Sequence, residues 1–239
     1  MIEVNTGSCR SESWLKQTPL LRDLPEHLIQ YVARHATVRQ LRDKECLFLQ
    51  NDPSHFIGII ADGDIHHVLS NSDGHELIIG HSASNQVIGI PALLSQTPRY
   101  ETARASGMTR VLLLSHEHFR PLLKEQTFHE RLLTVLKIQL EAYVAFIETM
   151  CLYSLEVRLA RHVLANLQQS DAPIPHVRLP AHQGLLASMI NASRPKLNGY
   201  LQKWKRQGVV RIHRNHLLID DLAQIRRTAQ LPALSPPAS

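Results

Sequence analysis

The stretch from residue 183 to residue 208, QGLLASMINASRPKLNGYLQKWKRQG, constrains the fold more than any other part of this sequence. Residues 185–190 place an apolar stripe at helical spacing and predict a first helix. Residues 191–192 form a turn, Ser193 is placed to cap a second helix, and Pro195 falls in the first turn of that helix. The stretch therefore predicts two helices joined by a tight turn.

The second helix of this pair has two different faces. Leu197, Leu201 and Trp204 recur at steps of four and three, so they face the core. By the ~100° step of an α-helix, the opposite face carries Pro195, Asn198, Gly199, Gln202 and Arg206. Gly208 ends the helix, and residues 209–212 and 217–219 then predict two short strands, a wing. A basic helix followed by a wing is typical of proteins that bind the major groove of DNA. An ordinary helical hairpin with a solvated basic face is the alternative.

The charge distribution favours DNA. The whole chain carries +5 with His neutral, and the residues from 154 onward hold 12 Lys and Arg against 4 Asp and Glu, while the first 153 hold 14 against 17. The basic charge is thus concentrated around the helical pair, which suits a polyanionic partner. No segment approaches the roughly 20 apolar residues that span a bilayer, and residues 1–12 lack the apolar core of a signal peptide. We expect a cytoplasmic protein without a membrane partner.

The N-terminal part predicts short strands. Residues 14–36 form a helical pattern, and apolar runs at 45–50, 56–61, 65–70, 75–80 and 108–114 follow it, separated by turn residues. Asp73 and Gly74 between two of these runs are a strong hairpin signal. Short strands punctuated by glycines predict a small antiparallel barrel or roll.

A long helix follows the roll, since no Gly or Pro occurs from residue 124 to residue 172. Apolar residues there repeat at alternating steps of three and four, which is the seam of a helix that pairs with a second copy of itself. This seam consists of Leu133, Leu136, Leu140, Tyr143, Ile147 and Met150. The alternative is a helix packed on its own barrel. A further helix is predicted over residues 155–167.

These patterns predict an α+β fold with four parts. Residues 1–126 form an antiparallel β-roll that acts as a sensor, and residues 127–153 form a long dimerisation helix. Residues 154–230 form a winged helix-turn-helix domain, and residues 231–239, LPALSPPAS, form a disordered tail.

This order of parts resembles the Crp/Fnr superfamily of bacterial transcription regulators over about residues 14–225. The most specific stretch is 192–198, ASRPKLN, followed by Leu201 and Gly208. In the roll, the matching residues are Gly63, Asp73, Gly74, Ile88, Gly89, Arg99, Arg104 and Ala105. The resemblance implies a homodimeric, sequence-specific regulator on double-stranded DNA with a two-fold symmetric operator, and RNA polymerase as a further candidate partner. A ligand-sensing roll that regulates a protein partner is the alternative function.

The resemblance also identifies a candidate effector pocket. Family members that bind cyclic AMP carry a Gly-Glu pair, a short helix, and then Arg followed by Ser or Thr. Here Gly89 and Arg99 are present, but Ile90 and Tyr100 replace the Glu and the Ser or Thr. Because Ile cannot accept a hydrogen bond, we expect that cyclic AMP is not the effector, whose identity stays open. Arg99 either holds an anion or forms a surface ion pair.

The recognition helix predicts specific DNA contacts. Positions that read bases in the best-known family members fall at Arg194, Pro195 and Gly199, so only the first is retained and the operator should differ. Arg194 suits guanine, and Asn198 and Gln202 suit adenine. The remaining candidates, Ser193, Lys196, Lys203, Lys205 and Arg206, belong to the same DNA-binding surface, where the cations should contact phosphates.

We expect no cofactor, no metal site and no enzymatic activity. Three scattered cysteines cannot supply the four ligands of an iron–sulfur cluster, and His116 with His118 would need a third metal ligand. His66, His67 and His81 are haem-ligand candidates only because histidine is abundant. No pairing of a nucleophile with a base, and no glycine-rich phosphate loop, emerges from the sequence.

Overall fold

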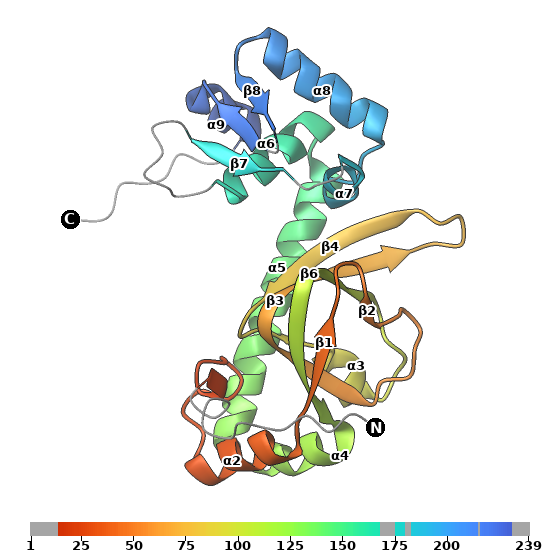
Figure 1. Ribbon diagram of the computed structural model, residues 1–239, viewed down its shortest axis with the longest axis vertical. Coiled ribbons are helices and arrows are strands. Elements are labelled where there is room, and N and C mark those ends of the chain that lie inside the picture. The colour runs from red at the N-terminus through yellow and green to blue at the C-terminus, as the bar shows by residue number, and fades with distance from the viewer. Residues whose placement is uncertain (1–13, 168–174, 180–182, 215, 231–239) are drawn as a thin grey trace, which may run out of the picture. The chain divides into compact units, whose positions relative to one another are not determined.

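The computed structural model describes residues 14–167, 175–179, 183–214 and 216–230, so the predicted tail lies outside the described residues. The chain divides into two compact units, Met1–Val144 and Ala145–Ser239. The two units are described separately (Figure 1). Among the described residues, no helix is both long enough and apolar enough to span a membrane.

The first unit is built on an antiparallel sheet. Its central strands are β3 (Phe56–Ser70) and β6 (Thr102–Ser115), which pair with each other along most of their length. The order is β1-β6-β3-β4, with β2 paired to β6 and β5 paired to β3. The other strands are β1 (Thr37–Leu41), β2 (Cys46–Phe48), β4 (Glu76–Ala83) and β5 (Val87–Ile88). An antiparallel roll was predicted, and the sheet confirms it.

Two predicted strands are one strand in the structure. The runs at 56–61 and 65–70 both belong to β3, whose register against β6 shifts on either side of Asp62. Such shifts bend a strand without ending it. The hairpin at Asp73 and Gly74 is confirmed, because β3 and β4 meet there and Gly74 has φ +78°.

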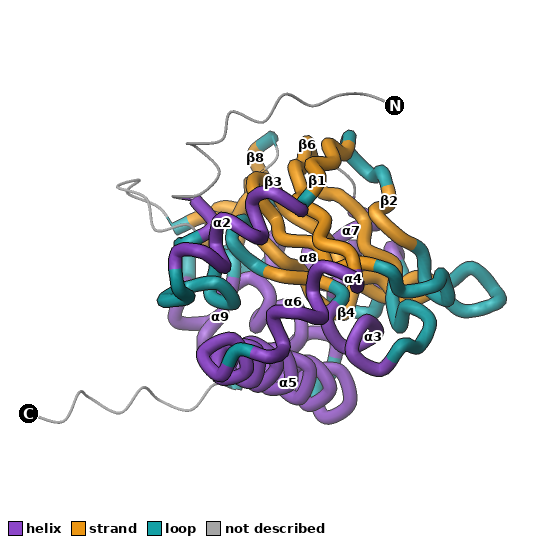
Figure 2. The backbone as a smooth tube through the Cα atoms, turned by 90° about the horizontal axis from the view of Figure 1, so that it is seen from below, coloured by secondary structure: helices purple, strands orange, loops and turns teal. Residues whose placement is uncertain are grey.

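Besides the helical residues 14 and 15, several helical segments lie in the described part of this unit in whole or in part. They are α2 (Glu26–His35), α3 (Ile90–Ser95), α4 (His116–Phe119), the 3-10 helix η1 (Arg120–Lys124) and the start of α5 (Gln126–Leu152). The helix predicted over 14–36 was too long, because residues 14 and 15 are helical, residues 16–23 form turns and a bend, and Pro25 directly precedes the first residue of α2. Phe128, Leu132 and Val135 of α5 share a core with Ile57 and Leu114 of the sheet. Figure 2 looks nearly along α5 and shows the strands β1, β3 and β6 of this unit gathered to one side of it.

The second unit is a winged helix-turn-helix. It contains the last turns of α5, then α6 (Leu155–Ala165), α7 (Gln183–Met189), α8 (Arg194–Arg206) and α9 (Leu222–Ala229). Three short strands, β7 (His176–Arg178), β8 (Val210–His213) and β9 (His216–Ile219), form an antiparallel sheet in the order β7-β9-β8. The predicted helical pair and wing are confirmed, whereas β7 and α9 were not predicted. Together the sheet, the long helix and this domain confirm the predicted fold class.

Candidate DNA-binding surface and ligand pocket

The helix α8 separates an apolar face from a polar one, as predicted. Leu197, Leu201 and Trp204 are buried in the core of the second unit. The residues on the other sides of the helix are exposed or partly exposed, and they include Arg194, Lys196, Asn198, Gln202, Lys205 and Arg206. Of the described residues in this unit, α8 therefore presents the densest row of cations and amides that solvent can reach. The cations of such a face can pair with phosphates, and its amides and Arg can form hydrogen bonds to base edges.

The structure corrects the expected cap of α8. Ser193 occupies the N-cap position with extended φ and ψ, but its side chain makes no capping hydrogen bond. A cap side chain accepts from the second or third helical N–H, and Pro195 at the second position has none. The Ser193 side chain is exposed and is not used as a cap.

Lys203 differs from the other cations of α8. Its Nζ donates to both carboxylate oxygens of Glu156 on α6, at 2.9 Å and 2.9 Å. The same carboxylate accepts the indole N–H of the buried Trp204 at 3.1 Å. Sequence reasoning missed Glu156, because only the packing of α6 against α8 brings it to these partners. Lys203 is thus paired within the protein, while the side chains of Lys205 and Arg206 are exposed.

The seam predicted on α5 divides between two environments. Leu133, Leu140 and Ile147 are 67%, 63% and 58% exposed. In contrast, Leu136 packs against the core of the roll, Tyr143 donates a hydrogen bond to Glu101, which directly precedes β6, and Met150 is partly buried. Val144, which was not predicted, is 57% exposed. We call Leu133, Leu140, Val144 and Ile147 the exposed stripe; the helical repeat places them on one side of α5.

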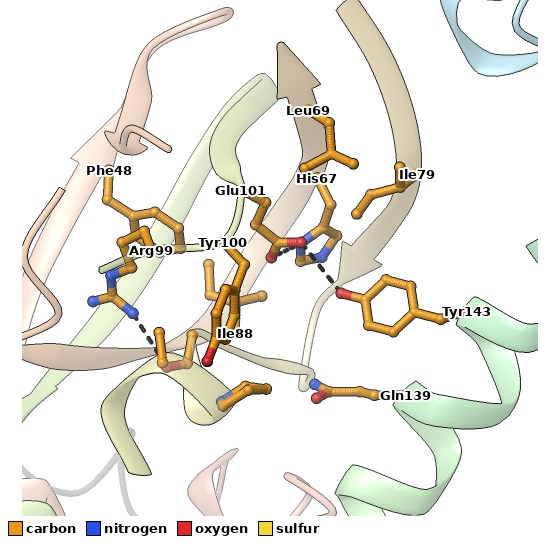
Figure 3. A pocket seen from close by; sticks show the side chains of 13 residues that line it. Phe48, His67, Leu69, Ile79, Ile88, Arg99, Tyr100, Glu101, Gln139 and Tyr143 are labelled. Atoms are coloured by element: carbon orange, nitrogen blue, oxygen red, sulfur yellow. Dashed lines mark hydrogen bonds and ion pairs between the residues drawn. The ribbon is translucent and has the colours of Figure 1, made fainter. Parts of the chain in front are cut away.

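A cavity of about 340 Å³ opens between the roll and α5 (Figure 3). Gly89, Arg99 and Tyr100, three of the four residues of the candidate effector pocket, line it. Ile90 does not line it and its predicted place in the pocket was wrong, since Ile90 is fully buried in the core shared by the sheet and α5. The φ of +81° at Gly89 precedes α3 and sets the direction in which that helix starts.

The structure excludes a surface ion pair for Arg99, which is only 1% exposed. Its guanidinium donates from Nη1 to the carbonyl of Gly89 at 3.2 Å and from Nη2 to the carbonyl of Phe56 at 2.6 Å. It also lies over the rings of Phe48 and Phe56, 4.1 and 4.7 Å from their centroids. Burial lowers the pKa of Arg99 to about 10, so it still carries its charge near pH 7.

A polar network forms the opposite wall of the cavity. Glu101 accepts hydrogen bonds from His67 Nδ1 at 2.5 Å and from the Tyr143 hydroxyl at 3.2 Å, and His67 Nε2 lies 2.8 Å from Ser82 Oγ. Burial, together with the nearby Glu101 carboxylate, raises the pKa of Tyr143, so this hydroxyl stays protonated. Within the described ranges, no three His, Cys, Asp or Glu side chains form a metal-binding group.

Comparison with known proteins matches both units. Residues 38–126 match the model of the cyclic nucleotide-binding domain, and residues 157–228 match that of the Crp-like helix-turn-helix domain. Together they cover more than half of the chain and define a DNA-binding transcription regulator with a cyclic-nucleotide-binding domain. The chain belongs to the Crp/Fnr superfamily. None of the curated proteins matches its sequence.

Several solved structures share this fold. The c-di-GMP-responsive global regulator CLP of Xanthomonas campestris is 18% identical with a TM-score of 0.69, over 82% of this chain and 99% of that one. FixK2 of Bradyrhizobium japonicum is 15% identical with a TM-score of 0.69, over 83% and 99%. A CRP-family transcriptional regulator of Thermus thermophilus is 19% identical with a TM-score of 0.68, over 80% and 96%.

Proposed function

We propose that the protein acts as a homodimer on a two-fold symmetric operator, reads that operator with α8, and responds to an effector other than cyclic AMP. RNA polymerase is a further proposed partner. The observation that carries the proposal is the face of α8, where Arg194, Asn198 and Gln202 are accessible beside Lys196, Lys205 and Arg206. The Arg and amide side chains of such a helix can form hydrogen bonds to base edges. The cations near its end can contact the flanking phosphates.

The exposed stripe supports the homodimer. Leu133, Leu140, Val144 and Ile147 lie on one side of a 27-residue helix and are each more than half exposed. A row of large apolar side chains costs free energy in water, and pairing with the same row of a second copy buries it. A two-fold dimer in turn places two recognition helices on half-sites about one helical turn of DNA apart.

Three features of the pocket and the adjoining helix α3 favour an effector other than cyclic AMP. The guanidinium of Arg99 already donates to two backbone carbonyls and its side chain is buried, so a cyclic phosphate would have to compete with these carbonyls for it. Pro91 stands in the first turn of α3 and removes an N–H that a phosphate would need. Ile90 occupies the core and offers no acceptor for a ribose hydroxyl.

Selection of bound sequences from random double-stranded DNA tests this function. We expect enrichment of an inverted repeat whose half-site centres lie about 10–10.5 bp apart. Calorimetry with cyclic AMP should give no binding below about 100 μM, because two lost partners each cost roughly tenfold or more. Enrichment of an asymmetric site would contradict the symmetric dimer, and a low-micromolar dissociation constant for cyclic AMP would contradict the proposed effector class.

A further inference from the structure

The cavity beside α5 is apolar over most of its wall. Its lining includes Phe48, Leu69, Ile79, Ile88, Pro91 and Ala92. A volume of about 340 Å³ is enough for a small organic molecule. Such a wall recognises a ligand mainly by burying its apolar surface, and only a few polar groups fix the orientation of the ligand.

The permanent cation in this wall is already bound by the protein itself. Arg99 is the cation that lines the cavity, and it is bound to the carbonyls of Gly89 and Phe56 between two aromatic rings. Its Nε has no hydrogen-bond partner among the described residues, but this atom is fully buried and a ligand cannot reach it. An anionic ligand would therefore have to compete with the Gly89 and Phe56 carbonyls for Arg99, and it would meet the Glu101 carboxylate as well.

Glu101 is a polar group in this wall that offers a ligand unused acceptor positions. A carboxylate has about four acceptor positions, and Glu101 uses two of them, for His67 and Tyr143. The bond from Tyr143 measures 3.2 Å, which is long compared with the usual ~2.5–3.0 Å between two oxygens and indicates a weak bond. The wall thus favours a ligand that donates a hydrogen bond to Glu101. The uncharged hydroxyl of Tyr143 is the donor in the structure.

We propose that the cavity binds a small uncharged molecule with an apolar body and one hydroxyl group, and that this hydroxyl replaces Tyr143 as the donor to Glu101. This inference rests on the proposed function, in which the roll is a sensor. Glu101 directly precedes the first residue of β6 and Tyr143 lies on α5, so the exchange releases a hydrogen bond that joins the long helix to the start of that strand (Figure 3). The same helix, α5, carries the exposed stripe. A ligand in the cavity therefore changes a contact of the helix that we propose to form the dimer.

Calorimetry on the full-length protein without DNA tests the head group with three probes of one chain length: 1-octanol, octylamine and octanoate. We expect 1-octanol to bind with a dissociation constant below about 1 mM and octanoate to bind at least about tenfold more weakly, because Glu101 repels its carboxylate. Octylamine is attracted by the Glu101 carboxylate but must lose the hydration of its charge, so it should bind no more tightly than 1-octanol. In Glu101→Gln the difference between octanoate and 1-octanol should shrink, because the neutral amide no longer repels an anion.

A second variant tests the exchange itself. Tyr143→Phe removes the competing hydroxyl and should tighten binding of 1-octanol by up to about tenfold, the value of one hydrogen bond to a charged group. Tyr31→Phe is the matched control, because the Tyr31 hydroxyl bonds to His118 away from the cavity. It should leave the affinity unchanged.

Three outcomes overturn the proposal: no binding of 1-octanol at about 1 mM, tighter binding of octanoate than of 1-octanol, or weaker binding in Tyr143→Phe than in the wild type. Because these titrations contain no DNA, failure of the ligand proposal is distinguishable from failure of the proposed function. Loss of operator binding with intact binding of 1-octanol would count against the proposed function alone.

Discussion

Arg99 lies directly against Gly89 and donates from Nη1 to the Gly89 carbonyl at 3.2 Å. A Cβ atom at Gly89 would clash with the same guanidinium. Arg99 can therefore be buried in this position only because residue 89 is a glycine. Gly89 also has φ +81°, a conformation that side chains rarely adopt.

Gly89→Ala should therefore destabilise the first unit more than a change in backbone conformation alone would. Gly74→Ala is the matched control, because Gly74 has φ +78° and no atom near the position of an added Cβ. We expect Gly74→Ala to cost about 1 kcal/mol and Gly89→Ala about 1–3 kcal/mol more, from the added overlap. Urea titration followed by hydrogen exchange of peptides from the first unit measures both, and equal losses would show that Arg99 moves aside freely.

Glu156 should be important for the stability of the second unit. Glu156→Ala leaves the indole N–H of buried Trp204 without its acceptor, and such a loss costs about 1–3 kcal/mol. Lys203→Ala keeps the bond between Glu156 and Trp204 and removes only a partly exposed ion pair, worth less than about 1 kcal/mol. Hydrogen exchange of α6 and α8 in urea compares the loss of stability in the two variants. A larger loss in Lys203→Ala would contradict this order.

The exposed stripe should hold the dimer together. Ile147→Lys places a charge in the paired seam opposite its own copy, which is unfavourable when buried, so sedimentation should show a shift to monomer. Ile138→Lys is the control, because Ile138 is 54% exposed on a different side of the same helix and should leave the dimer intact. A tight dimer of Ile147→Lys at micromolar concentration, or dissociation by both variants, would argue against the stripe.

The second unit was largely predictable because its signals are local. The positions of Leu197, Leu201 and Trp204 fix which side of α8 is buried, and Gly208 marks the end of that helix. The Asp73 and Gly74 turn was similarly predictable, because a two-residue signal defines the hairpin. In both cases a short stretch of chain carries all the information that is needed.

The pocket was only partly predictable because it depends on contacts between distant residues. Arg99 is buried against the carbonyl of Phe56, 43 positions away, and nothing near Arg99 in the sequence indicates this partner. Tyr143 fits the seam by its spacing, yet it faces Glu101, because a helical repeat does not say which neighbour occupies each side of the helix. Ile90 was placed in the pocket by alignment with the family, although the direction of α3 buries it in the core.

The salt dependence of operator binding tests the central claim, that α8 reads DNA, most directly. Arg194→Ala should weaken binding by about 1–3 kcal/mol and relax preference at one base pair in each half-site. Lys205→Ala should weaken binding to all sequences alike and lower the slope of log affinity against log salt by about one per contact, or about two for a symmetric dimer. Lys203→Ala should change this slope less than Lys205→Ala, because Glu156 already pairs with Lys203. Unchanged affinity and slope in all three variants would contradict the claim.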